Sequence, residues 1–150
     1  MWDFNGLPLH ALVVHAAVVF GPLSALAGLA YAVPAWRDRA RWPLVVAVLI
    51  AVGAIWVAYL SGEHLAETNK YGGPLLKLLE KHEDRAGILR LAMSGYAAVA
   101  LVAAWQHART GPLRWVLALL VVVLAVVALV YTYLTGDAGA QIAWYGVKPG

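Results

Sequence analysis

The chain contains no cysteine, and only 13% of its 150 residues are charged. The absence of cysteine excludes disulfide bonds, iron–sulfur clusters held by thiolates and covalently attached c-type haem. The scarcity of charge excludes an ordinary water-soluble domain, in which about a quarter of the residues are charged. The sequence also lacks a nucleophile–base pair, a glycine-rich phosphate loop and a hydrolase motif, so it names no enzymatic reaction.

Long apolar runs take up most of the chain. Hydrophobic residues make up 63% of it, and the mean hydropathy is +0.74. A helix needs about 20 apolar residues to cross a hydrocarbon core of about 30 Å. We predict a single transmembrane domain over residues 1–150, because no linker is long enough to separate two domains. The predicted helices cover 9–33, 42–61, 74–106 and 113–135, and a C-terminal tail covers 136–150.

The connections between these helices differ in charge. The first holds Arg37, Arg39 and Arg41, and the third holds Arg109 and Arg114, whereas the longer second connection mixes acids with lysines. Short loops rich in arginine stay on the cytoplasmic side of a membrane. We therefore predict a multi-pass protein of the bacterial cytoplasmic membrane with both termini outside. The first run is not expected to be a cleaved signal peptide, because no basic segment precedes it.

A short motif occurs twice. Residues Tyr59–Glu63 read Tyr-Leu-Ser-Gly-Glu, and residues Tyr133–Asp137, 74 positions later, read Tyr-Leu-Thr-Gly-Asp. Glycine tolerates the left-handed conformation that ends a helix, so Gly62 and Gly136 are predicted to end the second and fourth helices. The repeat predicts an all-α membrane protein, a four-transmembrane-helix bundle of two tandem helix pairs related by a pseudo-twofold axis along the membrane normal. The alternative is a chance similarity between two apolar helix ends.

Four of the five histidines lie at the predicted outer end of the helices. They are His10, His15, His64 and His82. A polar ring at the edge of the hydrocarbon is costly unless it has a partner, so these residues are functional candidates. Counted from the tryptophan at the cytoplasmic side of each helix, His15, His64 and His82 lie at one level, about 31–35 Å out. His10 lies about 7.5 Å further out and about 140° around the helix from His15.

Each candidate also has a purely structural interpretation. His15 lies in an apolar stretch and is either a ligand or an interhelical hydrogen-bonding residue. His82 precedes a run of charges and is either a ligand or an exposed interfacial residue. His64 follows the predicted helix stop and fits a loop residue better than a ligand, and His10 follows Pro8 at a helix start. His107, near Arg109, is interpreted only as part of the topology signal.

Several segments resemble the DUF2231 family of membrane proteins. They are Leu7–His15, Gly62–Glu67, Glu80–Glu83 and Gly136–Trp144. The resemblance covers essentially the whole chain and implies a four-helix bacterial membrane protein without a settled biochemical role. Some family members resemble fusions with Rieske or cytochrome c modules, which suggests redox work at the outer face. Ala11 departs from the pattern, because the family usually has proline there. The positions marked by the resemblance are His10, His15, Glu63, His82, Gly136 and Asp137.

The leading hypothesis is a b-type haem protein for electron transport near the outer face. His15 and His82 would bind the iron axially, with His10 beside the macrocycle and Arg85 or Lys81 meeting its propionates. This hypothesis favours a redox carrier over a hydrolase.

Two alternatives stay open. One is a zinc or copper site made by His15, His64 and His82 with Glu63 or Glu67. The other is an accessory structural subunit whose histidines only bond between helices. The partners expected are the lipid bilayer and a redox partner or a larger respiratory complex, and a homo-oligomer is a further alternative. Nucleic acid is not expected, because no basic stripe with interleaved aromatic residues is present.

Overall fold

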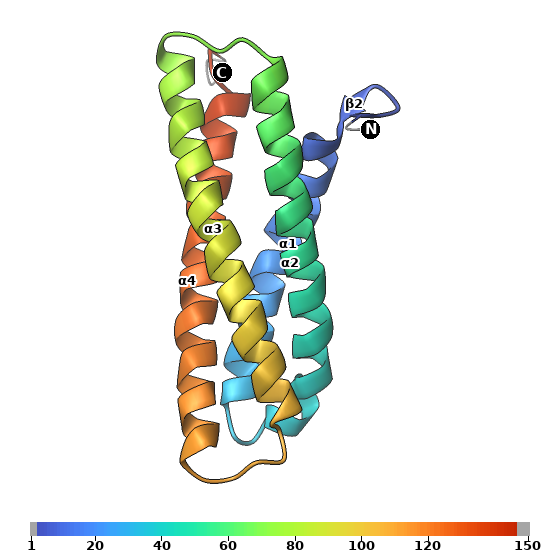
Figure 1. Cartoon of the computed structure of the whole chain (residues 1–150), viewed down its shortest axis with the longest axis vertical. Helices are drawn as coiled ribbons and strands as arrows, with labels where there is room; N and C mark the ends of the chain where they lie inside the picture. The colour runs from blue at the N-terminus through green and yellow to red at the C-terminus, as the bar shows by residue number, and fades with distance from the viewer. Residues whose placement is uncertain (1–2, 147–150) are drawn as a thin grey trace.

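The protein is a bundle of four long helices preceded by a short hairpin (Figure 1). The computed structural model describes residues 3–146. Its elements, in chain order, are β1 (Asp3–Phe4), β2 (Leu7–Pro8), α1 (Leu9–Ala32), α2 (Arg37–Thr68), α3 (Pro74–Trp105) and α4 (Pro112–Ala143). The helices run alternately up and down, so β2, the α2–α3 connection and the end of α4 lie together at one end, which we call the histidine end (Figure 1). The opposite end, with the α1–α2 and α3–α4 connections, is called the arginine end.

All four helices are long and apolar enough to cross a membrane. The bundle surface exposes more large apolar side chains than the surface of a water-soluble protein does. Leu91 in α3 and Leu119 in α4, for example, are 65% and 63% exposed. A surface of this kind faces lipid tails, where the helical backbone satisfies its own hydrogen bonds. The fold predicted from the sequence, a four-helix transmembrane bundle, is confirmed.

Two helices are longer than predicted, because the glycines expected to end them do not. The helix α2 begins at Arg37 and continues through Gly62 to Thr68, and α4 continues through Gly136 to Ala143. A glycine inside a helix costs only about 1 kcal/mol relative to alanine, which packing against other helices readily offsets. The first eight residues of the predicted tail are therefore helical.

The two helix pairs are arranged about a pseudo-twofold axis. The closest packing is between α1 and α2 and between α3 and α4, and α1 and α3 lie diagonally across the bundle. Two hydrogen bonds cross this diagonal. The Tyr31 hydroxyl donates to the carbonyl of Ala103 (2.8 Å), and the Tyr96 hydroxyl donates to the carbonyl of Ser24. Both pairs are 72 residues apart, as expected when a twofold axis sets each position of α1 opposite its equivalent in α3.

Small residues allow the diagonal helices to approach. The largest fully buried side chains are Tyr31 and Tyr96. A Cβ atom at Gly28 would lie 3.1 Å from the Tyr96 Cζ atom and closer still to its hydroxyl oxygen. Glycine at this position therefore makes room for the tyrosine that ties α3 to α1.

Candidate functional site

Two histidine rings face each other at the histidine end of the bundle. His10 lies in the first turn of α1 and His82 in α3, and their ring centroids are 6.3 Å apart with the planes at 82°. Their positions are 72 residues apart, the same spacing as the two tyrosine–carbonyl pairs deeper in the bundle. The two rings are therefore pseudo-equivalent residues that meet across the twofold axis.

Each ring is held by a hydrogen bond from Nδ1 to a backbone carbonyl of a neighbouring helix. The Nδ1 atom of His10 is 2.8 Å from the carbonyl oxygen of Ala58 in α2, and the Nδ1 atom of His82 is 3.0 Å from that of Thr135 in α4. A carbonyl oxygen only accepts, so each Nδ1 carries a hydrogen and donates it. In the neutral ring, Nε2 is then left with its lone pair. This is the arrangement in which proteins present a histidine to a metal, with the other ring nitrogen fixed by a backbone carbonyl.

A glycine supports each ring one helical turn beyond that carbonyl. A Cβ atom at Gly62 would lie 2.9 Å from Cε1 and 3.0 Å from Nδ1 of His10. A Cβ atom at Gly139 would lie 3.1 Å from Cε1 and 3.4 Å from Nδ1 of His82. Residues four apart share one face of a helix, so carbonyl and glycine present one continuous surface to the imidazole.

The structural repeat in α2 and α4 is shifted from the one read in the sequence. The carbonyls of Ala58 and Thr135, and likewise Gly62 and Gly139, are 77 residues apart instead of 74. Gly136, which the sequence motif pairs with Gly62, has no atom within 4 Å of where its Cβ would be. The two halves are thus related in space, but the short motif misaligns them by three residues.

His82 is brought together with His10 and not with His15. The His15 ring is exposed, and its Nδ1 is 2.8 Å from the carbonyl oxygen of Ala11 in its own helix. The predicted depths were counted from Trp36, but α1 already ends at Ala32. Counted from the observed helix ends at the arginine end, His10 lies 22 residues from Ala32 and His82 lies 23 residues from Trp105. The two histidines are therefore at the same level in the bundle.

The other predicted metal ligands lie in the last turns of α2. The side chains of Glu63, His64 and Glu67 are exposed there. Within residues 3–146, no group of three or more histidine, aspartate or glutamate side chains is arranged to hold a metal ion. Among the described residues, the structure therefore does not gather the ligands of the predicted zinc or copper site.

Polar groups on α3 and α4 surround the His82 side of the site. One guanidinium nitrogen of Arg85 donates to the carbonyl of Leu134 (2.8 Å) and lies 3.6 Å from a carboxylate oxygen of Asp137. The amide of Gln141 donates to the same carboxylate oxygen (2.9 Å). The buried hydroxyl of Thr135 has no hydrogen-bond partner among the described residues. Sequence reasoning missed Thr135 and Gly139, although the small residues near the repeated motif were visible.

His107, at the arginine end, is bound differently. Its Nδ1 is 3.2 Å from the Tyr31 hydroxyl oxygen, and its Nε2 is 2.9 Å from a carboxylate oxygen of Asp38. Arg37 donates to the same tyrosine oxygen (3.2 Å). Both ring nitrogens are thus engaged inside the protein, so the residue interpreted as a topology signal belongs to a structural network.

No curated protein and no solved structure matches the chain. A family model described as a predicted membrane protein, DUF2231, matches residues 6–148, which include both facing histidines and their supporting glycines. The chain therefore belongs to the DUF2231 family of predicted membrane proteins.

Proposed function

We propose that this protein binds one b-type haem between His10 and His82 and transfers electrons at the histidine end. The observation that carries this proposal is a pair of imidazoles on diagonal helices, each fixed through Nδ1 and each with Nε2 left to bind a metal. A porphyrin brings four nitrogen ligands of its own, so the protein has to supply only two. A bare zinc ion usually takes three or four protein ligands, and the described residues offer no such group.

The two rings lie close enough to hold one group together. Their centroids are 6.3 Å apart, and they come from helices on opposite sides of the bundle. Direct edge-to-face packing of rings also falls in this range, so the proposal depends on the two Nε2 atoms and not on the distance.

The surroundings fit a cofactor held at this level. Gly62 and Gly139 let the backbones of α2 and α4 approach the imidazoles, and the buried Thr135 hydroxyl is a hydrogen-bond donor without a partner in the described chain. When bound, haem supplies a one-electron couple. The carbonyls of Ala58 and Thr135 would fix the ligand orientation and raise ligand basicity, which tunes the potential. Arg85 was predicted to meet a propionate, but its guanidinium donates to the carbonyl of Leu134 and lies 3.6 Å from the carboxylate of Asp137.

We infer that the site lies on the outer side of the bacterial cytoplasmic membrane. The support is the position of the arginines at the arginine end: Arg37, Arg39 and Arg41 lie in the first turns of α2, and Arg109 lies in the α3–α4 connection. The redox partner, or the larger respiratory complex, would then approach the histidine end from outside.

The test is the visible spectrum of protein purified in detergent from cells supplied with haem precursor. We expect the Soret band and split visible bands of low-spin, bis-histidine haem. His10→Ala and His82→Ala should each lose this spectrum, and His15→Ala and His107→Ala should keep it. Added imidazole should restore the spectrum of a folded alanine variant, which separates a lost ligand from a lost fold.

Two outcomes would overturn the proposal. A colourless protein with stoichiometric zinc or copper would replace haem by a bare ion. A colourless, metal-free protein that co-purifies with a larger complex would make the histidines interhelical hydrogen-bonding groups in an accessory subunit.

A further inference from the structure

The pseudo-twofold axis relates two lateral grooves that are filled differently. In the groove between α2 and α3, the guanidinium of Arg90 lies over the rings of Trp56 (4.8 Å) and Tyr59 (4.2 Å). The Trp56 indole donates to the Ser94 hydroxyl (3.0 Å) across the same groove. Stacked cation–aromatic contacts of this kind close the space between the two helices.

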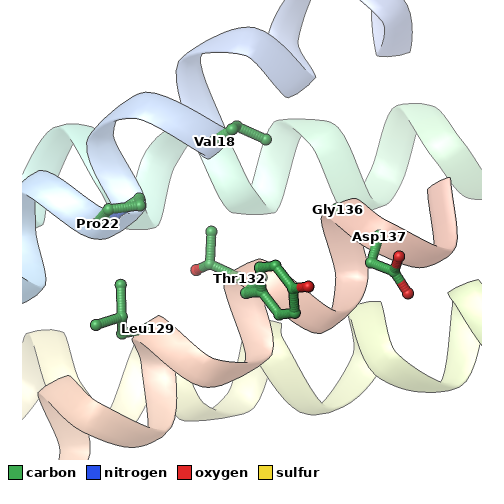
Figure 2. Close-up of a pocket in the computed structure, with 7 residues that line it drawn as sticks. Val18, Pro22, Leu129, Thr132, Gly136 and Asp137 are labelled. Carbon is green, nitrogen blue, oxygen red and sulfur yellow. The ribbon is translucent and has the colours of Figure 1, made fainter. Parts of the chain in front are cut away.

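The equivalent groove between α1 and α4 is open. By the 72- and 77-residue spacings, Val18 replaces Arg90, Pro22 replaces Ser94, and Gly136 replaces Tyr59. A hollow of about 410 Å³ results, lined by these three residues and by Leu129, Thr132, Tyr133 and Asp137. Figure 2 shows Leu129 and Thr132 pointing from α4 toward Val18 and Pro22 on α1, with Asp137 further along α4. Its size is that of a small-molecule site.

The hollow is lined mainly by apolar groups, and one carboxylate lies at its wall. This acceptor belongs to Asp137, at the histidine end of the hollow. Because Arg85 lies 3.6 Å from that carboxylate, its charge already has a counter-ion. A neutral head group that donates hydrogen bonds therefore fits better than an ammonium group.

We propose that the hollow binds a membrane hydroquinone, with a hydroxyl of its head group donating to Asp137 and its hydrocarbon tail lying along Pro22 and Leu129. This proposal rests on the proposed haem. Thr135, whose carbonyl holds His82, directly precedes Gly136 and Asp137, so the wall of the hollow and the histidine site share one turn of α4.

The proposed redox step accounts for two electrons and two protons. Oxidation of one hydroquinone to the quinone releases two electrons and two protons. Haem, which His10 and His82 would hold, would supply the one-electron acceptor, and the redox partner would take up the two electrons in turn. Asp137 would accept one proton, and the other would leave to water at the histidine end.

The probe is decyl-ubiquinone for binding and decyl-ubiquinol for reduction, both with purified protein in detergent. Gly136→Leu should fill the hollow without disturbing the fold, because a Cβ there meets nothing within 4 Å. We expect quinone affinity to fall by about tenfold or more. Gly53→Leu is the matched control, since it is also an exposed helical glycine with open space around it, and its affinity should change less than about twofold. Asp137→Asn should slow haem reduction by about tenfold or more, more than it weakens binding.

The readouts separate the two proposals. Haem-loaded protein with equal quinone affinity in the wild type and Gly136→Leu would overturn the hydroquinone site and leave the haem intact. Retention of phospholipid with no quinone affinity would do the same and make the hollow an acyl-chain groove. Quinone binding by a protein without haem would keep the hollow as a binding site and overturn its role as an electron donor site. Normal haem reduction by Asp137→Asn would overturn the role of the carboxylate.

Discussion

The helices α1 and α3 meet at two levels, and the contacts at these levels are of different kinds. Toward the arginine end, Tyr31 and Tyr96 bond directly to carbonyls of the opposite helix. At the histidine end, the opposed side chains are His10 and His82, and each bonds sideways to a neighbouring helix instead of to its opposite number. The tyrosine level joins α1 to α3 by hydrogen bonds, whereas at the histidine level two rings lie beside each other and their Nδ1 hydrogen bonds go to α2 and α4.

The same contrast distinguishes histidines of equal chemistry. Both ring nitrogens of His107 have partners inside the protein, so this ring has no capacity to bind a metal. His10 and His82 have one ring hydrogen bond each in the described structure. Hydrogen-bond accounting therefore separates His10 and His82 from His107. It does not separate them from His15, which also has one ring bond, but that bond stays within its own helix.

The largest expected effect comes from adding one methyl group at the histidine end. Gly62→Ala should displace the His10 ring, because its Cβ would lie 2.9 Å from Cε1. We expect haem occupancy, measured by absorption per protein, to fall by about tenfold. Gly139→Ala, with a closest approach of 3.1 Å to His82, should have a weaker effect, and Gly136→Ala should have none. A loss in Gly136→Ala equal to that in Gly62→Ala would contradict the 77-residue alignment and restore the one read from the sequence motif.

A second substitution tests the tyrosine contact between α1 and α3. Gly28→Ala would place a Cβ against the Tyr96 ring and hydroxyl, so the helices must separate or the tyrosine must move. Overpacking of this kind costs about 1–3 kcal/mol. Thermal unfolding in detergent should therefore shift downward, while the haem spectrum of the folded fraction stays unchanged. The matched control is Gly95→Ala in α3, where a Cβ meets nothing within 4 Å. Equal unfolding temperatures for the two variants would show that the Tyr96–Ser24 contact does not hold α1 to α3.

The sequence was a good guide to the helices and a poor guide to their orientation. The observed starts of α1 at Leu9 and α3 at Pro74 agree with the predicted ranges 9–33 and 74–106. The predicted choice of His15 rested on its apolar neighbours. In a membrane helix, the lipid-facing and core-facing sides are both apolar, so hydropathy does not tell which side a residue faces.

The partners of the histidines could not be read from the sequence at all. Ala58 and Thr135 act through backbone carbonyls, which every residue possesses, so their side chains give no signal. Gly62 was noticed, but its role was predicted from local backbone freedom. Its observed role is to leave space for a ring from α1, 52 residues earlier in the chain, and only the packed structure reveals that relation.

The smallest expected effect lies at the arginine end. Asp38→Asn removes the charge that faces Nε2 of His107, but the Asp38 side chain is 93% exposed. Exposed ion pairs contribute less than about 1 kcal/mol, so the unfolding temperature should change little and the haem spectrum should not change. Tyr31→Phe is the sharper variant, because it removes the hydroxyl shared by Ala103, Arg37 and His107, and it should destabilise more than Asp38→Asn. A change of the haem spectrum in either variant would mean that the arginine end is coupled to the histidine end, and the two levels of the diagonal would then not be independent.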